Sequence, residues 1–256
     1  MAIVTRTDEG ITTILIDRPA VRNCVNHETA LELREAFLAF DEDDSQKVAV
    51  LGGVGGTFCA GYDLKEAASG DGALHYEPEG EGPMGPTRML LDKPVIAAVD
   101  GYAVAGGLEL ALWCDMRIAE TDAVFGVFCR RWGVPLIDGG TVRLPRLIGQ
   151  SRALDMILTG RAVGAEEAHS WGLANRVVEK GTAHESAIEL AREIARFPEI
   201  CMRADRRSAH EQWGLDLDDA LNNEGIGGLK PLKEETRKGA ARFRDGKGRG
   251  GAFDSI

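Results

Sequence analysis

The chain has 256 residues with a formal net charge of −11, and 44% of its residues are hydrophobic. This size and composition predict one large globular domain with a substantial core, and the negative charge disfavours nonspecific binding to nucleic acid or anionic membranes. The longest apolar runs, residues 94–99 and 108–113, are too short to span a bilayer. The first ten residues carry acids and no apolar leader segment. We therefore expect a cytoplasmic protein with no nucleic-acid or membrane partner.

Strand and helix patterns alternate through about residue 180. Five short apolar or β-rich runs predict strands, at residues 11–16, 47–51, 94–99, 116–119 and 175–178. Apolar residues at helical spacing predict helices between them, at residues 28–40, 108–113, 151–158 and 165–171. The glycine-rich run at 52–56 is expected to end the second strand. This alternation indicates an α/β architecture.

Beyond Gly181 the pattern is wholly helical. A stripe from Ala187 to Ala195 ends at Pro198, and further helices are predicted around 199–213, 216–222 and 231–244. We therefore divide the chain into a core at residues 1–197 and a C-terminal helical region at residues 198–256. Residues 69–87 are rich in Gly, Pro and Glu, which predicts a mobile loop or lid.

Cysteine, histidine and serine patterns exclude several kinds of site. The five cysteines are scattered and form no CxxC pair, which argues against a disulfide framework and a cysteine zinc site. The five histidines show no metal-binding spacing, and no serine lies in a GxSxG motif. The sequence therefore predicts no metal site and disfavours a serine hydrolase.

The first motif that carries chemistry is Thr-Phe-Cys-Ala-Gly-Tyr-Asp-Leu-Lys at residues 57–65, directly after a strand and a glycine loop. The small Ala60-Gly61 pair lets the backbone approach a ligand closely, and the turn can present the N–H of Tyr62 to an anion or carbonyl. A purely structural turn explains the same residues. The preceding GGVGG run fits neither GxGxxG nor GxxxxGK[ST], so it does not predict a nucleotide loop.

The second motif, residues 100–111, follows a buried strand and opens a helix. Unpaired N–H groups at a helix N-terminus, such as that of Gly106, can hold an oxyanion. Glu109 lies three residues later and therefore projects on the same helix face. An acid in the first turn is also simply a good partner for the helix dipole.

Together the two motifs resemble the crotonase, or enoyl-CoA hydratase/isomerase, superfamily. The form F-x-A-G-x-D-hydrophobic-K is matched at residues 58–65, and G-hydrophobic-A-x-G-G-hydrophobic-E-L at residues 101–110. The similarity covers nearly the whole chain. It implies a spiral of ββα units with C-terminal helices that form a trimer, or a dimer of trimers. It also implies that a thioester carbonyl oxygen lies between the N–H groups of Tyr62 and Gly106, which stabilise an enolate.

The resemblance implies a general acid/base role for Glu109, which matches the family glutamate that helps to activate water. The second family glutamate is expected shortly after Phe125-Gly126, and counting without gaps places Cys129 there. This departs from the family pattern, since a buried thiol is a poor substitute for a carboxylate. Two interpretations of Asp138 stay open: it supplies the missing carboxylate, close to an aspartate of the dienoyl-CoA isomerases, or it caps the turn before Gly139.

The resemblance further implies a set of residues that contact the substrate or its coenzyme A. Lys65 matches a family lysine near the nucleotide, although a plain surface lysine explains it too, and Arg22 lies in the segment that passes the pantetheine and adenine. Phe243 and the shifted Lys247 reach the nucleotide from a neighbouring subunit. Residues 230–256 carry eight basic and four acidic side chains, which suits either a solvated helix face or a tail that pairs the phosphates of coenzyme A. Trp132 lines an acyl pocket or has a surface role. The predicted contacts are Arg22, Ala60, Asp63, Leu64, Lys65, Gly107, Cys129, Trp132, Phe243 and Lys247.

We therefore expect a homo-oligomeric enzyme, a trimer or hexamer, that acts on a fatty or branched acyl-CoA. Hydration of an enoyl-CoA is the first prediction, and coenzyme A is part of the substrate, so no separate cofactor is expected. The alternatives are an enoyl-CoA isomerase and, because of Cys129, a non-catalytic acyl-CoA-binding member of the family. Retention of Glu109 argues against the last, since a pure binder needs no carboxylate there.

Overall fold

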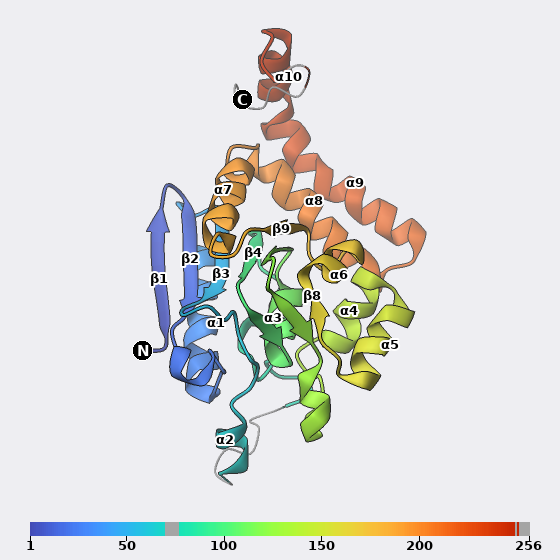
Figure 1. The fold of residues 1–256 in the computed structure, drawn as a ribbon. Coiled ribbons are helices and arrows are strands. Elements are labelled where there is room, and N and C mark those ends of the chain that lie inside the picture. The colour runs from blue at the N-terminus through green and yellow to red at the C-terminus, as the bar shows by residue number, and fades with distance from the viewer. Residues whose placement is uncertain (70–76, 249, 251–256) are drawn as a thin grey trace.

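The computed structural model describes residues 1–69, 77–248 and 250. Its main sheet has six strands in the order β1-β2-β3-β4-β6-β9 (Figure 1). The β1–β2 pair is antiparallel, and the later pairs of this sheet are parallel. The strands are β1 (Ile3–Asp8), β2 (Ile11–Ile16), β3 (Val48–Gly53), β4 (Val95–Val99), β6 (Met116–Glu120) and β9 (Arg176–Val178). The five predicted strands are confirmed.

Each face of the main sheet has its own core, because alternate residues of a strand point to opposite sides. Helix α7 (Ala183–Ala195) covers one face, where Val48 and Val50 of β3 are buried against it. Leu51 points to the other face, into a larger core that includes the apolar stripe of α1 (His27–Glu42). The predicted helix at 28–40 is thus α1, and its N-terminus is capped by Asn26, whose side chain accepts the N–H of Thr29.

A smaller sheet contains β5 (Tyr102–Val104), β7 (Val124–Gly126) and β8 (Val163–Gly164). The sequence does not predict these three short strands. Helix α3 (Gly106–Trp113) begins two residues after β5 and is buried along its whole length. The other helices of residues 64–170 are α2 (Leu64–Ala68), α4 (Gly140–Ile148), α5 (Gln150–Thr159) and α6 (Ala165–Ser170). Helices α3, α5 and α6 confirm the predictions.

The C-terminal helices extend away from the sheets (Figure 1). Helix α8 (Glu199–Glu211) packs on α9 (Leu217–Glu234), and α9 contacts α10 (Thr236–Arg244). The predicted break between 222 and 231 is wrong, because α9 continues through it despite three glycines and Pro231. The contact with α8 offsets the low helix propensity of these residues. In one chain α9 exposes Leu217, Leu221, Ile226, Leu229 and Leu232.

The expected end of the second strand at Gly52 is also wrong, since β3 continues through Gly52 and Gly53. A Cβ at Gly52 would lie 2.2 Å from the ring of His184, and one at Gly53 would lie 2.1 Å from the carbonyl oxygen of Thr57. The two glycines therefore belong to the strand because its neighbours approach the backbone closely.

The predicted loop or lid at 69–87 lies partly outside the described residues, which omit 70–76. Residues 82–87, at its other end, are buried rather than exposed as a lid would be. No helix of the described residues is long and apolar enough to cross a membrane.

Candidate active site

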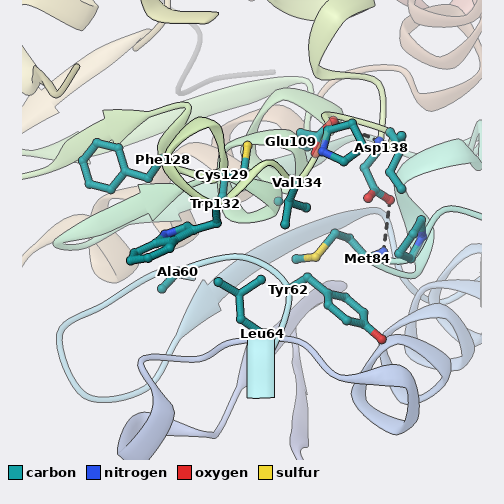
Figure 2. Close-up of a pocket in the computed structure, with 15 residues that line it drawn as sticks. Ala60, Tyr62, Leu64, Met84, Glu109, Phe128, Cys129, Trp132, Val134 and Asp138 are labelled. Carbon is teal, nitrogen blue, oxygen red and sulfur yellow. Dashed lines mark hydrogen bonds between the residues drawn. The ribbon is translucent and has the colours of Figure 1, made fainter. Parts of the chain in front are cut away.

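A cavity of about 80 Å³ lies where distant segments of the chain meet (Figure 2). Its walls come from the loop between β3 and α2, the start of α3, the short 3-10 helix η3 (Phe128–Trp132), and the segments at 83–84 and 134–138. The two sequence motifs therefore meet in space. The predicted site residues that line the cavity are Ala60, Tyr62, Leu64, Gly106, Glu109, Cys129, Trp132 and Asp138.

The N–H of Tyr62 has no acceptor among the residues that the structure describes. Tyr62 forms a parallel bridge with Val25, in which the Val25 N–H donates to Gly61 and the Asp63 N–H donates to Val25. This bridge uses the Gly61 carbonyl and the Asp63 N–H, and it leaves the Tyr62 N–H for a ligand.

The N–H of Gly106 is likewise without an acceptor in the described chain, because Gly106 is the first residue of α3. Ala105 precedes it with φ 53° and ψ −125°, a conformation that is strained for a residue with a side chain. A Cβ at Gly61, whose φ is +101°, would lie 3.0 Å from the Gly106 nitrogen. Glycine at position 61 is therefore what keeps this amide accessible.

Glu109 is buried, and its Oε1 accepts the N–H groups of Asp138 and Gly140 at 2.9 and 2.8 Å. Burial, and then the negative charge of Asp138, raise the pKa of Glu109 to about 8, although the two N–H groups act in the opposite direction. A Cβ at Gly140 would lie 2.9 Å from Oε1, so this approach requires glycine. Glu109 thus faces the cavity and accepts hydrogen bonds from a distant segment. Its position at the helix start therefore does more than place an acid near the helix dipole.

The Asp138 carboxylate is also buried, and its Oδ1 accepts the N–H of Met84 at 3.0 Å and the hydroxyl of Thr87 at 2.5 Å. Burial raises its pKa. The interpretation that Asp138 caps its own turn is wrong, because the N–H that it accepts lies 54 residues earlier. Its proposed role in the chemistry stays a prediction.

Comparison with known proteins identifies the family. The family model for enoyl-CoA hydratase/isomerase matches residues 6–245. The chain belongs to the enoyl-CoA hydratase/isomerase family. A carnitinyl-CoA dehydratase of Proteus mirabilis is 40% identical over 200 residues, which cover 77% of this chain and 76% of that protein.

Solved structures show the same fold. An enoyl-CoA hydratase from Mycobacterium tuberculosis H37Rv is 36% identical with a TM-score of 0.88, covering 95% of this chain and 96% of that one. An enoyl-CoA hydratase from Bacillus anthracis is 32% identical with a TM-score of 0.88, covering 96% of each chain. The chain is therefore an enzyme of the enoyl-CoA hydratase/isomerase family with the crotonase fold.

In this chain, η3 carries Cys129 and Trp132 to the cavity. Cys129 is buried, and burial and the nearby Glu109 carboxylate raise the pKa of its thiol. Cys129 is therefore a neutral thiol close to Glu109. Trp132 is 69% exposed and yet lines the cavity, beside Ala60 and Leu64 at one edge (Figure 2). Trp132 therefore borders the cavity with a largely exposed side chain, and its contact with an acyl group stays a prediction.

The residues predicted to contact coenzyme A divide into groups. Arg22 and Lys65 have exposed side chains, and the Arg22 carbonyl accepts the N–H of Ala60 at 3.0 Å, next to the cavity. Asp63 caps α2 through the N–H of Lys65 and pairs with Arg18 at 3.2 Å, so it supports the loop.

Three other predicted contacts lie outside the cavity. A Cβ at Gly107 would lie 2.0 Å from the Cys59 carbonyl oxygen, so glycine at this position allows α3 to pack on the first motif. Phe243 and Lys247 are exposed in and after α10, at the opposite end of the molecule from α2 (Figure 1). Their contact with a neighbouring subunit's substrate stays a prediction.

Sequence reasoning missed the wall formed by Pro83 and Met84, and the apolar residues at 134–137. A single apolar Met between Gly-Pro turn residues was the signal available, and it does not show which distant segment the turn contacts. In the described part of the chain, no group of three or more His, Cys, Asp or Glu side chains is placed to hold a metal ion.

Proposed function

We propose that this protein is an acyl-CoA hydro-lyase, which adds water reversibly to a 2-enoyl thioester through an enolate. The observation that carries the proposal is that the N–H groups of Tyr62 and Gly106, both without acceptors in the described chain, line the same cavity as the buried Glu109. The names of the relatives, enoyl-CoA hydratase and carnitinyl-CoA dehydratase, support addition or removal of water.

The two N–H groups suit the charge that this reaction develops. Attack at the β-carbon moves negative charge onto the thioester oxygen, and donors that are already oriented stabilise it selectively. Removal of one such donor typically costs about 3–4 kcal/mol of transition-state stabilisation. Backbone donors have no titration of their own and need no ordering of a side chain.

A single carboxylate can complete the proton transfers. Ionised Glu109 accepts a proton from water as the water oxygen bonds to the β-carbon and the π electrons move to the thioester oxygen. Protonated Glu109 then delivers that proton to the α-carbon as the enolate collapses to the carbonyl. The carboxylate is regenerated, so the reaction is balanced without a second acid. Dehydration follows the same path in reverse.

Cys129 stands where a second carboxylate is expected, and this favours a second candidate, double-bond isomerisation. That reaction moves one proton between two carbons, which a single carboxylate can do. Incubation with crotonyl-CoA and with 3-enoyl-CoA separates the candidates by product mass and NMR. Hydration adds the mass of water, isomerisation leaves the mass unchanged, and a non-catalytic binder gives no product. Only the first outcome supports our proposal.

We also propose that the protein forms a trimer or a dimer of trimers through its C-terminal region, residues 198–256, on a core of residues 1–197. The exposed leucines and isoleucine of α9 support this, because an apolar face of that kind is typical of an interface. In such an assembly Phe243 and Lys247 would reach a neighbour's coenzyme A. Analytical ultracentrifugation tests the assembly, and a monomer would contradict it.

A further inference from the structure

One wall of the cavity is a tight turn formed by Gly82, Pro83, Met84 and Gly85. The N–H of Gly85 donates to the carbonyl of Gly82 at 2.9 Å. Proline at the first central position favours such a turn, and Gly85 adopts φ +91° directly after it. Met84 is the second central residue, and its side chain is fully buried at the cavity.

This turn is fixed from two sides. The carboxylate of Asp138 accepts the N–H of Met84 and the hydroxyl of Thr87. On the other side a Cβ at Gly85 would lie 2.5 Å from the carbonyl oxygen of Ala30, so the turn lies directly against α1. The wall is therefore held by buried contacts with both neighbouring segments.

A second cavity of about 270 Å³ lies beyond this wall. It is lined by Ala30 and Leu31 of α1 and by described residues between 77 and 85. Pro83 lines both cavities, which places the turn between them. Met84 also lies against the start of α3, since a Cβ at Gly106 would be 2.6 Å from its sulfur.

The direction of the acyl chain follows from the exposure of the cavity's two ends. Trp132 and Leu64 are 69% and 39% exposed, and they lie with Ala60 at one edge of the cavity (Figure 2). The coenzyme A part of a bound thioester would leave the cavity through this exposed edge. Met84 and Asp138 lie across the cavity from that edge and are buried. An acyl chain held at the motif amides therefore extends toward Met84.

We propose that Met84 limits acyl chain length and makes this an enzyme for short-chain thioesters; the proposal rests on the acyl-CoA function above. The cavity of about 80 Å³ is small. This size suits a short acyl group together with the water molecule that attacks it. A longer chain meets the Met84 thioether, and removal of that side chain would connect the acyl cavity to the second one.

The test compares butyryl-CoA with octanoyl-CoA in binding, by calorimetry, and crotonyl-CoA with 2-octenoyl-CoA in turnover. The wild type should favour the four-carbon thioester at least 10-fold in both. Met84→Ala should shift the ratio toward eight carbons at least 10-fold. Leu31→Trp fills the second cavity, so adding it to Met84→Ala should restore the original ratio, whereas alone it should leave crotonyl-CoA turnover unchanged.

Equal wild-type affinity for both chain lengths, or an unchanged ratio in Met84→Ala, overturns the proposal and indicates that longer chains leave elsewhere. If Met84→Ala does not fold, Met84→Val retains part of the side chain and should shift the ratio in the same direction by less; no shift overturns the proposal. If binding shifts as expected while no thioester is turned over, the chain-length assignment stands and the hydro-lyase function fails.

Discussion

Asp138 donates its backbone N–H to Oε1 of Glu109 at 2.9 Å, while its own carboxylate holds the Met84 turn. One residue therefore positions the proposed acid/base group with its main chain and the cavity wall with its side chain. Its negative charge also helps to raise the pKa of Glu109. The position of the wall and the proton affinity of the acid/base group are thus connected through a single buried residue.

The pH dependence of turnover should show one rising limb. The pKa of Glu109 is raised to about 8 by burial and by Asp138, and the proposed path starts from its ionised form in both directions. kcat/KM should therefore rise with a midpoint near pH 8 and reach a plateau about one pH unit higher, for hydration and for dehydration alike. A bell-shaped profile would instead implicate a second, protonated group such as Asp138.

Glu109→Gln should lower turnover by about 100-fold or more, because the side chain keeps its size and loses its basicity. Folding raises the pKa of this acid from its ordinary 4.5 to about 8. Between these pH values the acid ionises in the unfolded chain and stays protonated in the folded one, so the stability of the wild type falls as pH rises. Glutamine does not titrate, so the melting temperature of the variant relative to wild type should increase between pH 5 and pH 8.5. Near-normal turnover would remove Glu109 from the mechanism.

Gly61→Ala should lower turnover by about 100-fold, as expected for loss of one oxyanion donor. The added Cβ would lie 3.0 Å from the Gly106 nitrogen and close the approach to that amide. Gly56→Ala is the matched control, because Gly56 also has positive φ but nothing within 4 Å of its Cβ position. Both variants should have a lower melting temperature than the wild type, because each places a side chain at positive φ, but Gly56→Ala should keep its turnover. Equal turnover in the two variants would show that the reaction does not use the Gly106 N–H.

Asp138→Ala should destabilise the fold by about 1–3 kcal/mol, since the buried Met84 N–H loses its acceptor. Asn at 138 can still accept that N–H, so Asp138→Asn should melt near wild type. Chemical denaturation and steady-state kinetics on both variants separate the two roles. Lost turnover in Asp138→Asn at unchanged stability would assign the carboxylate to the chemistry, whereas retained turnover would limit it to holding the wall.

Sequence patterns predict those parts of the fold that bury regular apolar faces. The strand at 47–51 belongs to this class as a continuous buried apolar run, and α1 belongs to it through an apolar stripe at helical spacing. β1 escapes prediction because only Ile3 of its six residues is buried. α4 does so because it begins with Gly140 and contains Pro145.

The candidate site likewise contains parts that a local sequence pattern encodes and parts that depend on distant residues. The loop at Tyr62 and the helix start at Gly106 are local features, which a short motif can specify. The Met84 wall depends on a hydrogen bond to Asp138 across 54 residues, and no local pattern encodes such a partner. Likewise, the Asp138 charge that helps burial to raise the pKa of Glu109, and the N–H groups of Asp138 and Gly140 that oppose it, come from the distant turn at 138–140.

Ala105 occupies backbone angles that suit glycine, immediately before the Gly106 amide. The N–H of Ala105 donates to the Gly126 carbonyl, and the Ala105 carbonyl accepts the N–H of Glu109. The peptide group between Ala105 and Gly106 therefore cannot rotate without breaking the bond from Glu109. The chain thus gives up some folding free energy to aim a donor before any substrate arrives. Glycine at position 105 would remove this strain, but it would also allow the Gly106 N–H to adopt several orientations. Ala105 therefore lowers the stability of the fold and fixes the direction of the donor.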